Sequence, residues 1–127
     1  MTYNIKSAAN LTPNSQRFLG KSVLITGGAG GMGLAATRMF AAEGAEVSVL
    51  DVSHDAGQAM IQDMSEKGYD VFFEQADLSK SKEINAGIDA VLSKRGRIDT
   101  LFNHAGTIIV KPFHEMTEEE YDFLMDV

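Results

Sequence analysis

A stretch rich in glycine, Thr26–Gly33, holds residue types that could bind a nucleotide. It follows the apolar run Val23–Ile25 and leads into a segment of good helix formers. A glycine turn between a strand and a helix lets a phosphate approach the backbone, and the helix N-terminus offers it unpaired N–H groups. The stretch therefore predicts a dinucleotide site, with a turn that only packs a helix on a strand as the alternative. Three glycine registers are open: Gly28-x-Gly30-x-x-Gly33, Gly27-x-x-Gly30-x-x-Gly33 and Gly27-x-x-x-Gly31-x-Gly33.

A carboxylate, Asp51, follows the second apolar run, 45–50, and lies 18 residues after Gly33. A carboxylate at a strand end can accept hydrogen bonds from both hydroxyls of an adenosine ribose. The same charge repels a 2′-phosphate, and no Arg or Lys occurs in 26–33 or directly after Asp51. We therefore predict NAD rather than NADP as the cofactor. A strand-end Asp that begins a turn is the alternative.

Polar and small residues also follow the next two apolar runs. Asp77 comes after the run 71–73, where the adenine edge of a nucleotide would lie, or else it is a turn residue near a helix. Asn103–Gly106 follows the run 98–102. In open α/β sheets, ligands bind outside the carboxyl ends of the strands. Small residues there allow close approach of a cofactor, and the Asn103 side chain can tie neighbouring backbones together.

The elements that must position these residues alternate along the chain. Ser53 and Ser79 can cap the second and third helices, and Thr117 with Glu120 forms a capping box at the start of a last helix. The expected strands are 21–26, 45–50, 71–73 and 98–102, and the expected helices before the last are 31–43, 54–67 and 80–95. This alternation predicts an α/β fold: a doubly wound parallel sheet with right-handed crossovers and helices on both faces, in three layers, α/β/α.

Composition bounds the class of protein. The 127 residues suffice for one domain, and a formal net charge of −7 argues against a nucleic-acid surface. No apolar run approaches the ~20 residues of a membrane helix, and the polar start lacks a secretory signal, so a cytoplasmic location fits. The lack of cysteine excludes thiolate metal sites, and three scattered histidines predict no metal site. We interpret residues 1–19 as a tail or arm and residues 20–127 as the dinucleotide-binding domain.

In this order and spacing, the motifs in residues 20–127 resemble the short-chain dehydrogenase/reductase family. Thr26–Gly33 looks like its Thr-Gly-x-x-x-Gly-x-Gly cofactor motif, and Ala76–Leu78 looks like the turn that carries its adenine-contacting Asp. Asn103–Gly106 resembles its Asn-Asn-Ala-Gly motif, with His104 in place of the second Asn. The resemblance implies a Rossmann-type sheet with strand order 3-2-1-4.

The resemblance also implies an activity. It implies hydride transfer between a nicotinamide and the carbonyl or alcohol group of a small-molecule substrate, in an enzyme that is a homo-oligomer. Together with the loop and the strand ends, it predicts these cofactor-binding residues: Gly27, Gly30, Gly31, Met32, Gly33, Asp51, Asp77, Leu78, Asn103, Ala105 and Gly106.

The catalytic side chains of that family are not found in this sequence. In the family a Tyr acts as general acid/base, a Lys four positions on lowers the Tyr pKa and holds the ribose, and a Ser orients the substrate oxygen. The tyrosines Tyr3, Tyr69 and Tyr121 are followed four positions on by Ser7, Phe73 and Met125. We therefore expect no catalytic residue here, but an apparently truncated, N-terminal cofactor-binding part that is inactive by itself. A non-catalytic nucleotide-binding or interaction module is the alternative.

The implied strand order has a consequence for the solubility of the chain. Strand 98–102 would form an edge of a parallel sheet, with apolar faces that lack helix cover. We therefore expect the chain by itself to be poorly soluble, or to need a partner or the missing half.

Overall fold

The computed structural model describes residues 16–127. Its elements follow the predicted alternation, with the glycine stretch between the first strand and the first helix. In chain order they are β1 (Ser22–Thr26), α1 (Gly31–Ala42), β2 (Glu46–Asp51), α2 (His54–Glu66), β3 (Val71–Gln75), α3 (Ser81–Arg95), β4 (Thr100–Asn103) and α4 (Glu118–Asp126). A short 3-10 helix, Phe113–Glu115, precedes α4.

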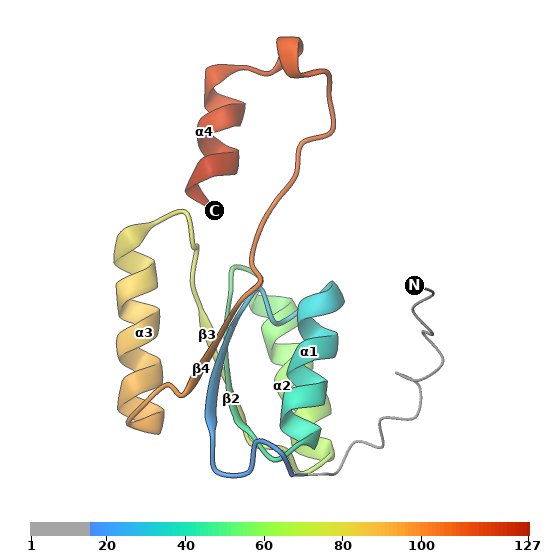
Figure 1. Ribbon diagram of the computed structural model, residues 1–127, viewed down its shortest axis with the longest axis vertical. Coiled ribbons are helices and arrows are strands. Elements are labelled where there is room, and N and C mark those ends of the chain that lie inside the picture. The colour runs from blue at the N-terminus through green and yellow to red at the C-terminus, as the bar shows by residue number, and fades with distance from the viewer. Residues whose placement is uncertain (1–15) are drawn as a thin grey trace, which may run out of the picture.

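The strands form one parallel sheet in the order β3-β2-β1-β4. Figure 1 shows α1 and α2 on one face of the sheet and α3 on the other. The register places Leu24 of β1 beside Ser48 of β2 and Leu101 of β4. The predicted doubly wound, three-layer fold with strand order 3-2-1-4 is therefore confirmed.

The centre of the sheet is buried on both faces, which explains why the middle of β1 is apolar without a break. Val23 and Ile25 belong to one core cluster, together with Met60 and Met64 of α2. Leu24 belongs to a second cluster, which includes a valine of α3. Because alternate residues of a strand point to opposite faces, β1 holds a helix layer on each side of the sheet.

The start of α3 differs from the sequence-based expectation. Ser79 is predicted to cap this helix, but the N-cap residue is Lys80, which makes no side-chain cap hydrogen bond. The Ser79 hydroxyl instead donates to the Asp77 carboxylate at 2.7 Å, so it has a partner outside the helix. The other predicted caps are confirmed, since Ser53 caps α2 and the capping box begins α4.

The edge strand β4 begins two residues later than predicted. The Asp99 N–H donates to the Ser22 carbonyl at 2.8 Å, but the Ser22 N–H donates to the Asp99 carboxylate, also at 2.8 Å, so a side chain replaces one of the backbone acceptors at this end of the ladder. Within β4, 56% of Leu101 and 37% of Phe102 are exposed. The predicted uncovered edge is confirmed for residues 16–127, because β4 is paired there with β1 alone.

Segments at both ends of the described chain lie beyond the sheet. Phe18 packs edge-on against Phe40 of α1, with ring centroids 4.9 Å apart, so the end of the predicted tail contacts the domain. Residues 1–15 lie outside the described residues, and the interpretation of 1–19 as a tail stays a prediction. An extended segment carries α4 past the carboxyl end of the sheet (Figure 1). No helix within residues 16–127 combines the length and apolar character needed to cross a membrane.

Candidate cofactor site

A cavity of about 800 Å³ opens at the carboxyl ends of the strands. Its walls come from the segments that follow all four strands and from α4. Most of the predicted cofactor residues line it: Gly27, Gly30, Gly31, Met32, Asp51, Asp77, Leu78, Ala105 and Gly106. The other two do not line it. Gly33 lies against the Gly27 carbonyl in the loop that follows β1, and Asn103 accepts a hydrogen bond from the Thr26 hydroxyl. The fold therefore gathers residues that are far apart in the sequence at one concave site.

The segment 27–33, called the glycine loop from here on, requires glycine at four positions. A Cβ on Gly28 would come within 2.9 Å of the Thr37 hydroxyl and of a Val49 methyl group. Gly27 and Gly31 have φ angles of +67° and +52°, a region that favours glycine. A Cβ on Gly33 would collide with the carbonyl oxygen of Gly27. At Gly30, by contrast, a Cβ would meet no heavy atom within 4 Å, so the space beside it is open. Of the three registers, Gly27-x-x-x-Gly31-x-Gly33 is the one in which all three positions require glycine, because the other two include Gly30.

Three hydrogen bonds hold the glycine loop to the elements beside it. The Gly27 N–H donates to a backbone carbonyl of β2 at 2.8 Å. The hydroxyl of Thr37, a fully buried residue of α1, donates to the carbonyl of Gly28 at 2.9 Å. The Ala29 N–H donates to the Asp51 carboxylate at 3.0 Å. The loop then leads into α1, whose first turn has no side-chain cap and no acidic residue, as suits an anion-binding helix end.

Asp51 lies at the carboxyl end of β2, as predicted, and faces the cavity. Its Oδ2 accepts from the Ala29 N–H and its Oδ1 accepts from the Ser53 N–H, both at 3.0 Å. A carboxylate can accept about four hydrogen bonds, so about two positions remain for a ligand. This number matches the two hydroxyls of a ribose.

Thr26 joins the segments that follow β1 and β4. Its hydroxyl donates to the Asn103 amide oxygen and accepts from the N–H groups of His104 and Ala105, each at 3.0 Å. Asn103 is predicted to tie neighbouring backbones, but Thr26 does so, and Asn103 bonds to the Thr26 hydroxyl. The feature of the sequence that could have indicated this role of Thr26 is its position as a hydroxyl residue at the end of an aliphatic run. The ring of His104 stacks on Phe102, with centroids 5.4 Å apart, and the residue also lines the cavity.

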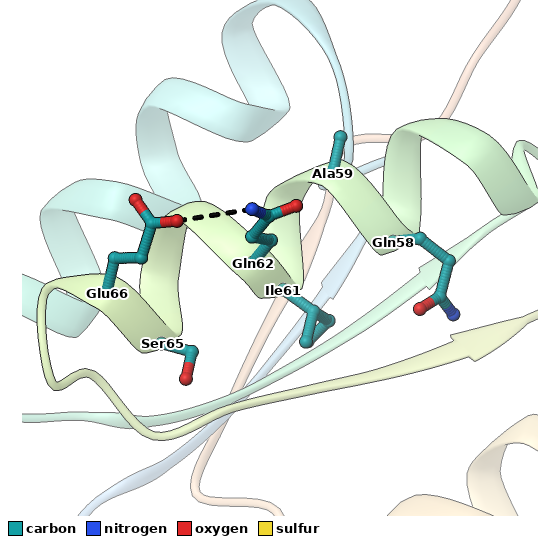
Figure 2. A pocket seen from close by; sticks show the side chains of 6 residues that line it. All are labelled: Gln58, Ala59, Ile61, Gln62, Ser65 and Glu66. Atoms are coloured by element: carbon teal, nitrogen blue, oxygen red, sulfur yellow. Dashed lines mark hydrogen bonds between the residues drawn. The ribbon is translucent and has the colours of Figure 1, made fainter.

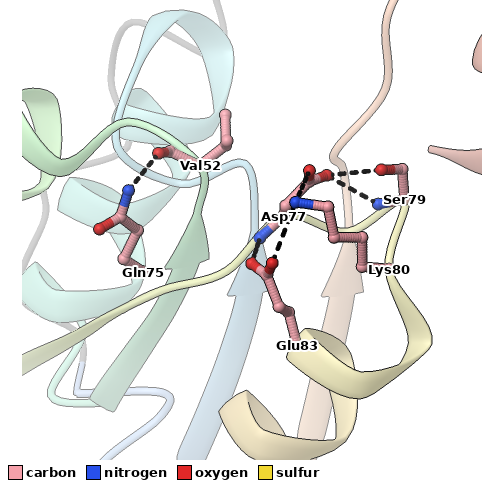
Figure 3. A network of polar contacts seen from close by, with 6 residues as sticks. All are labelled: Val52, Gln75, Asp77, Ser79, Lys80 and Glu83. Carbon is pink, nitrogen blue, oxygen red and sulfur yellow. Dashed lines mark hydrogen bonds and ion pairs between the residues drawn. The ribbon is translucent and has the colours of Figure 1, made fainter.

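Asp77 lies in a polar network before α3, which Figure 3 shows. Its carboxylate accepts from the Ser79 hydroxyl at 2.7 Å and the Ser79 N–H at 3.1 Å, and it pairs with Lys80 Nζ at 3.0 Å. Glu83 accepts the Asp77 N–H at 2.7 Å and also pairs with Lys80. The Ser79 hydroxyl, followed by Lys80, lowers the pKa of Asp77 to about 2. At neutral pH this carboxylate is therefore ionised and fixed beside the cavity.

The last helix supplies a wall of the cavity that the sequence analysis does not assign. Phe123 of α4 and Val127, which directly follows this helix, line the cavity together with Ile108 of the preceding segment. Lys111 Nζ contacts both carboxylate oxygens of Glu120, at 2.9 and 2.7 Å. This ion pair holds the extended segment against the helix, so both contribute to the same wall.

A second hollow lies on the outer surface of α2 and is shown in Figure 2. All its lining residues belong to this one helix: Gln58, Ala59, Ile61, Gln62, Ser65 and Glu66. Gln62 and Glu66 are hydrogen-bonded to each other at 3.2 Å. A hollow on one helix lacks polar groups that converge from several elements, so it is not a candidate for the cofactor.

The described tyrosines are not placed for chemistry at the cavity. Tyr69 packs against the first core cluster, and Tyr121 lies in α4. Neither lines the cavity. Within the part of the chain that the structure describes, no group of three or more His, Asp or Glu side chains could hold a metal ion.

Comparisons with known proteins agree with this geometry. The sequence model described as "short chain dehydrogenase" matches residues 21–127. A cyclopentanol dehydrogenase of Comamonas testosteroni is 32% identical over 107 residues, which are 84% of this chain and 43% of the relative. A 3-oxoacyl-(acyl-carrier-protein) reductase of Chlamydia muridarum is 34% identical over 107 residues, with the same shares covered. The chain therefore spans less than half the length of these curated relatives.

Solved structures show the same fold. Levodione reductase superposes with a TM-score of 0.81 at 35% identity, over 87% of this chain and 44% of that one. A short chain dehydrogenase from Mycobacterium smegmatis superposes with a TM-score of 0.85 at 30% identity, over 90% of this chain and 48% of that one. With the family match over 21–127 and the glycine register required by the backbone, these likenesses show that the chain belongs to the short-chain dehydrogenase family.

Proposed function

We propose that this chain binds NAD in preference to NADP and is the cofactor-binding part of an oxidoreductase. The observation that carries the proposal is the Asp51 carboxylate, which faces the same cavity as the glycine loop. No lining residue, among those the structure describes, is Lys or Arg. A 2′-phosphate at this position would therefore meet a negative charge without a compensating cation.

The geometry of the cavity supports a role for each wall. The N–H groups of the glycine loop and of the start of α1 would hold the pyrophosphate. Asp51 would accept hydrogen bonds from the adenosine ribose, and the turn at Asp77 and Leu78 would contact the adenine. Ala105 and Gly106, which are small, would let the nicotinamide half approach the end of β4. The bound nicotinamide supplies the chemistry, because its ring gives or accepts the hydride.

The proposed reaction is hydride transfer between the nicotinamide and the carbonyl or alcohol group of a small molecule. The similar proteins support this class, because their names give cyclopentanol, a 3-oxoacyl group and levodione as substrates. We further propose a cytoplasmic enzyme that is a homo-oligomer. Since the 127 residues hold no Tyr-x-x-x-Lys, we expect them to bind the cofactor without turnover by themselves.

The cofactor preference can be tested by isothermal titration calorimetry of the chain with NAD⁺ and with NADP⁺. We expect NAD⁺ to bind at least about tenfold more tightly, which corresponds to roughly 1.4 kcal/mol. Binding of NADP⁺ more than about tenfold tighter than NAD⁺ would contradict the proposed role of Asp51.

Gly30→Val tests where the cofactor binds. Gly30 has an extended backbone, with φ −141° and ψ 166°, which a β-branched residue adopts readily. A side chain there would meet open space and would project beside the cavity. We expect unchanged resistance to urea and strongly weakened NAD⁺ binding. Wild-type NAD⁺ affinity in this variant would place the cofactor elsewhere.

A further inference from the structure

We propose that Asp51 is a positioning residue for the glycine loop as well as the residue that selects the ribose. One carboxylate would then set both the cofactor preference and the anion affinity of the loop. Only the selection of the ribose by Asp51 rests on the proposed function. The attachment of the loop to Asp51 is a property of the ligand-free protein.

The Ala29 N–H is the centre of the argument. Ala29 lies in the middle of the glycine loop and is 4% exposed, so water has little access to it. Its N–H donates to Asp51 Oδ2 at 3.0 Å. The other two attachments of the loop use a backbone carbonyl of β2 and the Thr37 hydroxyl, so only the attachment at Ala29 depends on a side chain that also faces the cavity. A buried N–H that loses its acceptor destabilises the conformation that holds it.

The second carboxylate oxygen makes a different kind of contact. Asp51 Oδ1 accepts from the N–H of Ser53, an exposed residue that caps α2. Water can replace this acceptor at Ser53, but not at the nearly buried Ala29. The amide of an asparagine at position 51 would therefore direct its one oxygen to Ala29 and keep the loop attached. An alanine at position 51 would keep neither contact.

Charge and attachment predict opposite effects on anion binding. Removing a negative charge beside an anion site strengthens the binding of pyrophosphate. Removing the attachment weakens it, because the loop N–H groups must be ordered when the anion binds. Asp51→Asn changes the charge and keeps the attachment, whereas Asp51→Ala changes both. A small residue at position 51 would therefore remove the repulsion of a 2′-phosphate and still fail to give tight binding of either dinucleotide.

The first measurement is amide hydrogen exchange at Ala29 in the ligand-free protein, read by NMR. We expect Asp51→Ala to speed exchange at Ala29 by about tenfold or more, and Asp51→Asn to leave it within about threefold of the wild type. Asp55→Asn is the matched control, because it removes an exposed charge from the first turn of α2 and should change nothing at Ala29. If Asp51→Ala fails to fold, Asp51→Ser tests the same loss, because its hydroxyl is too short to reach Ala29.

The second measurement is the affinity for inorganic pyrophosphate, followed by ³¹P NMR titration. We expect the affinity to rise in Asp51→Asn and to fall at least about threefold in Asp51→Ala, relative to the wild type. Unchanged exchange at Ala29 in Asp51→Ala, or pyrophosphate binding as tight as in Asp51→Asn, would overturn the inference. Faster exchange at Ala29 in a protein that binds no dinucleotide would support the attachment while the proposed function fails.

Discussion

Replacement of Thr26 by valine tests the contact that joins the ends of β1 and β4. Thr26 is 7% exposed, and its hydroxyl takes part in three hydrogen bonds of 3.0 Å. Valine has nearly the same shape, so the change removes the hydroxyl without leaving a cavity. Each bond contributes about 0.5–1.5 kcal/mol, which gives an upper range of about 1.5–4.5 kcal/mol. His104 and Ala105 are half-buried, so water can recover part of the loss. We expect Thr26→Val to lower the free energy of unfolding by about 2 kcal/mol.

Urea denaturation followed by circular dichroism measures this loss. With an m-value of about 1.5 kcal/mol/M, a loss of about 2 kcal/mol lowers the midpoint by about 1.3 M. Thr26→Ser is the control, because it keeps the hydroxyl and loses only a methyl group, at a cost of about 1 kcal/mol. Amide exchange at His104 and Ala105 should accelerate in Thr26→Val and not in Thr26→Ser. The reasoning is refuted if Thr26→Val unfolds at the wild-type midpoint, or if Thr26→Ser is the less stable of the two.

Two further predictions concern ion pairs. Because the pKa of Asp77 is lowered to about 2, its ionised form stabilises the fold fully above the unfolded pKa of about 3.9, and this stabilisation is lost as the pH falls toward 2. In a ¹³C titration of the side-chain carboxyl, Ser79→Ala should raise this pKa more than Lys80→Met, since the Ser79 hydroxyl is the larger cause. At the other end of the sheet, the Arg95 side chain is 5% exposed and its partner Asp70 is 62% exposed. Asp70→Asn should therefore lower the free energy of unfolding by about 2 kcal/mol in urea denaturation, because the nearly buried Arg95 keeps its hydrogen bonds to Ser48 and Val47 but loses its carboxylate partner.

The order of elements could be predicted because its signals are local. Short apolar runs such as 23–25 indicate buried strands, and glycines such as Gly44 and Gly96 indicate helix ends; both of these adopt positive φ in the structure. The errors occur where a side chain bonds outside its own element. The Ser79 hydroxyl donates to Asp77 and not to the helix that it precedes. The Asp99 carboxylate accepts the backbone N–H of Ser22. Such partners depend on the folded geometry, which local patterns do not describe.

The candidate site shows the same limit. The glycine loop and the two aspartates could be found because each has a characteristic place relative to one strand. The roles of Thr26 and Thr37 could not be assigned in this way. The Thr26 hydroxyl bonds to backbone 78 and 79 residues away, and the Thr37 hydroxyl is buried against the loop. A threonine in an aliphatic run is also common in ordinary cores, so the residue type alone does not reveal the contact.

The topology explains why the contacts of Thr26 and Asp51 matter together. β1 lies between β2 and β4, and the chain leaves β1 through α1 on one face of the sheet but reaches β4 through α3 on the other. The direction of the crossovers therefore changes at β1, and the segments after β1 and β4 separate there to open a crevice. Asp51 attaches the glycine loop toward β2, and Thr26 attaches the end of β1 to the segment after β4. Loss of either contact should widen or disorder one side of the crevice, so binding can weaken in variants whose altered residue touches no phosphate.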